Sequence, residues 1–175
     1  MKKRSILSLI VAGLVVLAIF GWPWTLCLLG FLRGEHFYDG RPASYWSWQV
    51  DSYANSASAS YPTILRGGPT AVPVLRELAR DPKPLVRVYA IQTLLDQSFD
   101  DEETIRSTIP PLIDLLQRGD QINRCRGAQL LAQMGSFARE AIPALRQAQQ
   151  EGPDNVYLIT TEARANASNS ATAQG

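Results

Sequence analysis

The chain has 175 residues, 46% of them hydrophobic and 19% charged, which fits one globular domain with additional segments. Its formal net charge is +1, but residues 2–4 are all basic, so residues 33–175 carry 14 basic and 16 acidic residues, a net charge of −2. A nucleic-acid-binding domain usually has a clear basic excess, so the composition argues against a nucleic-acid partner. Cys27 and Cys125 do not have the spacing of a metal site, and the sequence indicates no metal and no cofactor.

The first predicted element is a membrane anchor. The 28 residues between Arg4 and Arg33 are uncharged and mostly apolar, and about 20 apolar residues suffice to cross a bilayer. A cleaved signal peptide is the alternative, but no small-residue cleavage site follows the apolar run. Basic residues are densest before the segment and tend to stay in the cytoplasm. The sequence therefore predicts residues 1–32 as a cytoplasmic tip and single-pass anchor in the cell membrane, with the rest of the chain outside the cytoplasm.

A connector is predicted at residues 33–43, followed by an aromatic capping helix and loop at residues 44–66. Ser44 is expected to be the helix N-cap. Trp46, Val50 and Tyr53 follow with the i, i+4, i+7 spacing of one helix face. This face is predicted to cover the apolar surface of the first helical unit that follows it in the sequence.

Tyr45 and Trp48 lie on another face of the same predicted helix. They are candidate partner-binding residues, because Tyr and Trp favour both protein interfaces and membrane headgroups. If both rings are buried, the segment is only a cap.

Residues 67–165 contain three similar units, in which an apolar residue, a proline and a leucine recur at offsets of 37 and 33 residues. Pro73, Pro110 and Pro143 are each expected in the first turn of a helix. A polar break and a second helical pattern follow each first helix, and paired helices at this period predict a stacked α-solenoid. The second helix of the third unit has the poorest pattern.

The residues Val86-Arg87 with Ala90 and Leu94 resemble a HEAT repeat of the bacterial HEAT-like type, and the pattern returns 37 residues later at Arg124. The resemblance covers roughly residues 68–165 and weakens in the third unit. It implies an all-α fold, a short HEAT-like α-solenoid of about two and a half helical-hairpin repeats after the transmembrane helix. The segment FYDGRPASYW also resembles one that precedes the repeats in membrane-anchored bacterial HEAT-repeat proteins.

Arg87 and Arg124 occupy equivalent positions in the predicted second helices. In HEAT-like stacks such an arginine commonly pairs with an acidic residue of a neighbouring turn, here Asp81 or Asp120. The alternative is a row of arginines that binds an acidic partner, so both are candidate partner-binding residues.

The remaining polar residues predict no catalysis. His36 is the only histidine, and no serine lies in a nucleophile-elbow sequence. The acidic run at residues 100–103 is expected to begin a helix, with Asp101 or Thr104 as its cap. Residues 166–175 are small and polar and are predicted to be a disordered tail.

The predicted function is therefore a membrane-anchored protein-protein interaction module or scaffold without enzymatic activity. HEAT-like proteins mostly hold other proteins, and no small-molecule ligand is identifiable. An enzyme-accessory protein related to the lyase-type HEAT-like repeats is the alternative. It would require a pocket with converging polar groups near Arg124 or the aromatic helix.

Overall fold

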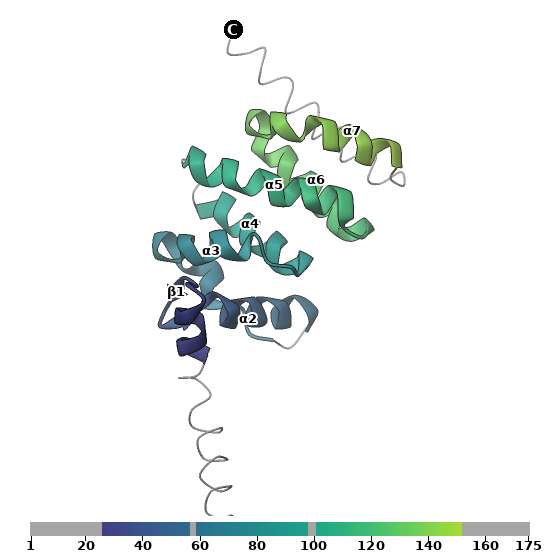
Figure 1. Cartoon of the computed structure of the whole chain (residues 1–175). Helices are drawn as coiled ribbons and strands as arrows, with labels where there is room; N and C mark the ends of the chain where they lie inside the picture. Colours follow the sequence, from purple (N-terminus) through teal and green to yellow (C-terminus); the bar gives the residue numbers. More distant parts are fainter. Residues whose placement is uncertain (1–25, 57–58, 98–100, 152–175) are drawn as a thin grey trace, which may run out of the picture.

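A computed structural model describes residues 26–56, 59–97 and 101–151. Within these ranges, α2 lies at one end of a stack of helices and α7 at the other (Figure 1). None of the helices in the described ranges has both the length and the apolar character needed to cross a membrane. Most of the predicted anchor and all of the predicted tail lie outside the described residues.

The helices form two layers, because α4 packs against α2 and α6 while α5 packs against α3 and α7. α3 also packs closely against α4, and α5 against α6, as expected for helical hairpins. The first-helix layer consists of α3 (Val72–Leu78), α5 (Glu102–Arg118) and α7 (Ile142–Glu151). The second-helix layer consists of α2 (Ala43–Asn55), α4 (Pro84–Gln97) and α6 (Gln121–Met134).

One apolar core runs through the described units of the stack. Its fully buried side chains come from both layers, including the capping helix α2, and burial of such side chains contributes about 1.5–3 kcal/mol each. They include Trp46, Leu75, Leu94, Leu112 and Leu131. The predicted second helix of the third unit lies outside the described residues.

The all-α prediction needs one correction, because the connector contains a small β-hairpin. β1 (Phe37–Tyr38) pairs antiparallel with β2 (Arg41–Pro42). The turn residues Asp39 and Gly40 have φ values of 49° and 67°. An Asp-Gly pair favours this two-residue turn, since both positions need a positive φ.

The capping helix α2 begins one residue earlier than predicted, and Ser44 is not its N-cap. The N-cap is Pro42, which has no side-chain acceptor. Instead, the Glu35 carboxylate accepts a hydrogen bond from the backbone N–H of Ser44 at 2.9 Å. The connector thus supplies the acceptor that the helix start lacks.

The predicted buried face of α2 is largely confirmed. Trp46 and Val50 are buried in the core, while Tyr53 is half-buried against the rings of Tyr61 and Tyr89. The indole N–H of Trp46 donates to the backbone carbonyl of Tyr38, which ties α2 to the hairpin. α2 therefore both covers the first repeat and anchors the connector.

The prolines begin only two of the three first helices. Pro73 and Pro143 lie at the second position of α3 and α7, each after a 3₁₀ segment, η2 (Gly68–Ala71) and η3 (Gly135–Ala141). Pro110 and Pro111 instead lie inside α5, so the prediction of a helix start there is wrong. α5 starts eight residues before Pro110, because Asp101 caps it and two acidic residues occupy its first turn.

Candidate interaction sites

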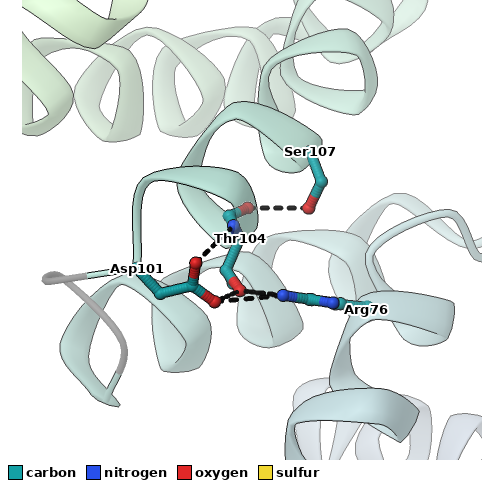
Figure 2. A network of polar contacts seen from close by, with 4 residues as sticks. All are labelled: Arg76, Asp101, Thr104 and Ser107. Atoms are coloured by element: carbon teal, nitrogen blue, oxygen red, sulfur yellow. Dashed lines mark hydrogen bonds and ion pairs between the residues drawn. The ribbon is translucent and has the colours of Figure 1, made fainter.

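A polar network joins α3 to α5 in the first-helix layer (Figure 2). Arg76 Nη2 lies 3.0 Å from Asp101 Oδ2 and also donates to the Thr104 hydroxyl. The side chain and backbone N–H of Thr104 donate to the Asp101 carboxylate, and Ser107 Oγ donates to the Thr104 carbonyl. The Thr104 hydrogen bonds, assisted by the charge of Arg76, lower the pKa of Asp101. The polar groups of this network are hydrogen-bond partners of one another. The network therefore connects two repeats and is not a candidate binding site.

Arg87 also connects repeats, although not through the predicted carboxylates. Its Nη1 atom lies 2.6 Å from Asp114 Oδ2 in α5, and its side chain is only 12% exposed. Asp81 and Asp120 are engaged elsewhere, since their side chains accept backbone N–H groups at the starts of α4 and α6. Arg124 is partly buried at the equivalent place in α6.

The structure brings the other two candidates, Tyr45 and Trp48, together on α2. Their ring centroids lie 6.1 Å apart; Tyr45 is half-buried, whereas Trp48 is 59% exposed. The guanidinium carbon of Arg41 lies 4.5 Å from the centroid of the Tyr45 ring, and Arg41 also donates to the Tyr45 hydroxyl. Trp48 is therefore the more exposed of the two rings that were predicted as partner-binding residues.

These rings line a cleft of about 620 Å³, which we call the aromatic cleft. Its apolar lining comes from Leu26, Cys27, Pro42, Tyr45 and Trp48. Its exposed polar lining comes from the hairpin turn and the start of α2, at Asp39, Gly40, Arg41 and Ser44. The volume falls within the range of about 300–1,000 Å³ that is typical of small-molecule sites.

The helix at residues 26–32 forms one side of the aromatic cleft and is held against the hairpin. A Cβ atom on Gly30 would lie 2.5 Å from Cβ of Pro42, so this close approach requires glycine. The Cys27 thiol also lies 3.4 Å from the Gly40 carbonyl oxygen. The large side chains on the rest of this helix are exposed, namely Leu28, Leu29, Phe31 and Leu32.

A second cleft of about 240 Å³ lies between α4 and α6 on the second-helix layer. Sequence reasoning did not single it out, although its residues recur at the 37-residue offset that relates Gln92 to Gln129. Within the described residues, the side chains of Gln92, Gln129 and Gln133 make no hydrogen bond and Arg126 forms no ion pair. We call this site the amide cleft; its lining is Val88, Tyr89, Gln92, Arg126, Gln129, Leu130 and Gln133.

The described residues contain no group of three or more His, Cys, Asp or Glu side chains that could hold a metal ion. No curated protein and no solved structure is significantly similar to the chain. A family model for HEAT repeats matches residues 72–163, which is just over half of the 175 residues. This match covers α3 to α7, the elements whose paired packing and cross-repeat arginines are described above. The chain therefore belongs to the HEAT-repeat family.

Proposed function

We propose that this HEAT-repeat protein is a membrane-anchored scaffold that binds an extended segment of a partner protein in the amide cleft. HEAT-repeat domains generally act as protein-interaction scaffolds. The observation that carries the proposal is the amide cleft, where the side chains of Gln92, Gln129 and Gln133 make no hydrogen bond to any residue that the structure describes. By contrast, Arg76 and Arg87 are engaged in contacts between repeats.

The chemistry of the amide cleft suits a polypeptide backbone. A glutamine side chain has an acceptor oxygen and two donor hydrogens, so Gln92, Gln129 and Gln133 can each pair with a peptide group. Arg126 adds a cation that can pair with a carboxylate or carbonyl of the partner. Tyr89 supplies an aromatic ring beside them, and rigid aromatic side chains are common at binding hot spots.

The proposed membrane anchor is supported by the apolar sequence before residue 33 and by the exposed side chains that continue it. Four large apolar side chains on residues 26–32 are exposed, and such a patch usually marks contact with protein or membrane. Alkaline carbonate extraction of cell membranes tests the anchor, which should keep the chain in the pellet. Protease treatment of intact cells tests the orientation, because an exocytoplasmic repeat domain should be degraded without lysis.

Site-specific photocrosslinking tests the partner-binding role. A photoreactive amino acid at Gln129 in the amide cleft should capture a reproducible partner from membranes. The matched control is the same amino acid at Gln117, an exposed glutamine on α5 in the other layer. Arg126→Glu should then reduce the yield at position 129. Equal capture at positions 117 and 129 would contradict the proposed site.

The alternative role, an enzyme-accessory protein of the lyase-related HEAT-like type, is favoured by one observation. The aromatic cleft combines apolar walls with the charged side chains of Asp39 and Arg41. An accessory protein would retain its partner enzyme's substrate in that cleft. Co-purification of a pigment or other small molecule, lost in Trp48→Ala, would support this role over the scaffold.

A further inference from the structure

We propose that the aromatic cleft binds one phospholipid with a phosphoethanolamine headgroup, drawn from the bilayer leaflet beside the repeat domain. The inference rests on the membrane anchoring proposed above. In an anchored chain the cleft lies at the bilayer surface, because its lining residues Leu26 and Cys27 lie near the end of the predicted anchor at residues 1–32. A phospholipid is then the ligand present at the highest local concentration.

The charges of the cleft fit a zwitterion. Asp39 and Arg41 are both exposed and both line the cleft. Neither forms an ion pair with any residue that the structure describes, so one anion and one cation are available in the same cleft. The phosphate of a phosphoethanolamine group can accept from Arg41, and its ammonium can donate to Asp39. A headgroup with a phosphate alone would leave the Asp39 carboxylate unpaired.

These two side chains are carried by a rigid support. Asp39 and Gly40 form the tight turn of the hairpin, whose strands pair Tyr38 with Arg41. The Arg41 guanidinium is held over the Tyr45 ring and by its hydroxyl. Little conformational entropy is therefore lost when the headgroup binds, which favours affinity.

The apolar part of the cleft fits the glycerol backbone and the first part of an acyl chain. Leu26, Cys27, Pro42 and Trp48 provide this surface, and the same helix carries further exposed apolar side chains at residues 28–32. Tryptophan and tyrosine are enriched at the depth of lipid headgroups, where one end of the ring is wet and the other apolar. The position of Trp48 and Tyr45 beside Arg41 follows that pattern.

The experiment is native mass spectrometry of the full chain in a neutral detergent. Dioleoyl phosphatidylethanolamine, phosphatidylcholine and phosphatidylglycerol are titrated separately, and the fraction of lipid-bound protein is measured. We expect phosphatidylethanolamine to bind about three- to tenfold more tightly than the other two, the effect of one additional solvent-exposed hydrogen bond of ordinary net strength. Phosphatidylcholine cannot donate this hydrogen bond, and phosphatidylglycerol has no ammonium.

Three variants separate the parts of the site. Asp39→Asn should abolish the preference for phosphatidylethanolamine, and asparagine tolerates the positive φ of this position. Arg41→Gln should weaken the binding of all three lipids to a similar extent, because each of them has a phosphate. Asp96→Asn removes an exposed carboxylate of α4 outside the cleft and should leave the preference unchanged. Circular dichroism of each variant verifies that the helices are retained.

Equal binding of the three lipids to the unaltered chain would overturn the proposal, and so would an unchanged preference in Asp39→Asn. A lipid-free dimer that Trp48→Ala dissociates would instead assign the cleft to a second copy of the chain. Carbonate extraction is measured on the same preparation and reports on the anchor alone. A chain that stays in the membrane pellet but shows no preference refutes only the lipid site. A chain that is extracted yet keeps the preference refutes only the anchor.

Discussion

Replacing Trp46 with alanine tests whether α2 covers the end of the repeat stack. The Trp46 side chain is 1% exposed and packs against the rings of Tyr38 and Tyr45, with centroids 5.5 and 5.2 Å away. Truncating a buried tryptophan to alanine typically costs about 3–5 kcal/mol. The indole N–H also lies 3.1 Å from the Tyr38 carbonyl oxygen and 3.2 Å from that of Arg41, and both contacts are lost. We therefore expect a loss near the upper end of this range, about 4–5 kcal/mol.

The matched control is Trp48→Ala, two residues along the same helix. Its ring is 59% exposed, so its removal should change the free energy of unfolding by less than about 1 kcal/mol. Urea titration of the full chain in detergent, followed by far-ultraviolet circular dichroism, measures both variants. If both variants are destabilised equally, burial of Trp46 does not stabilise the stack and α2 is not a cap.

Two ion-pair contacts between repeats give further predictions. Asp114→Asn should cost about 2–3 kcal/mol in a urea titration, because it removes the carboxylate from Arg87, whose side chain is 12% exposed. Arg118→Ala alters an 81% exposed partner of the same carboxylate and should cost less than about 0.5 kcal/mol; equal losses would refute the buried role of Arg87. The Thr104 hydrogen bonds hold the pKa of Asp101 below its ordinary value of 3.8, so this carboxylate stabilises the fold above that pH and its contribution disappears as the pH falls through the lowered pKa. Asp101→Asn removes this titrating carboxylate but keeps a good N-cap. It should therefore flatten the pH dependence of the free energy of unfolding below about pH 4, and an unchanged profile would contradict the network.

The helical periodicity was sufficient to predict the repeats and much of the capping helix. Trp46 and Val50 share a face because residues four apart lie above one another on a helix, and both are buried. Gly135 ends α6 with a φ of 54°, as a glycine after a helical pattern indicates. These features depend on residues close together in sequence, which is why local patterns reveal them.

Contacts between distant residues could not be predicted in the same way. The sequence allows several acidic residues as the partner of Arg87. The packing of α4 on α5 determines that the partner is Asp114. Two helix starts were predicted for this region, one at the acidic run with Asp101 or Thr104 as its cap and one at Pro110, and the start capped by Asp101 is confirmed. The cap determined the start, and Arg76 of the preceding repeat adds a contact to it that no local pattern contains.

The aromatic cleft was predicted only in part. Tyr45 and Trp48 were recognised from their helical face, but Arg41 and Asp39 were treated as parts of a connector. The Asp-Gly pair between Tyr38 and Arg41 was an available signal, because this dipeptide favours a two-residue hairpin turn. Recognising it would have placed two opposite charges on one rigid turn. The side of the cleft formed by residues 26–32 depends on the close approach of Gly30 to Pro42, which no local pattern shows.

α2 connects the two clefts physically, and this bears on how a scaffold would work at a membrane. Its buried face fixes the rotation of the helix, so Tyr45 and Trp48 line the aromatic cleft while Tyr53 contacts Tyr89, a lining residue of the amide cleft. Both sites rest on one close-packed core, and such interiors resist continuous deformation, so the repeat stack would keep the two sites at a set separation. A lipid bound at one end would then fix the orientation of the stack relative to the bilayer. A partner bound between α4 and α6 would be held at a set distance from the membrane surface, which a flexible tether after the anchor could not achieve.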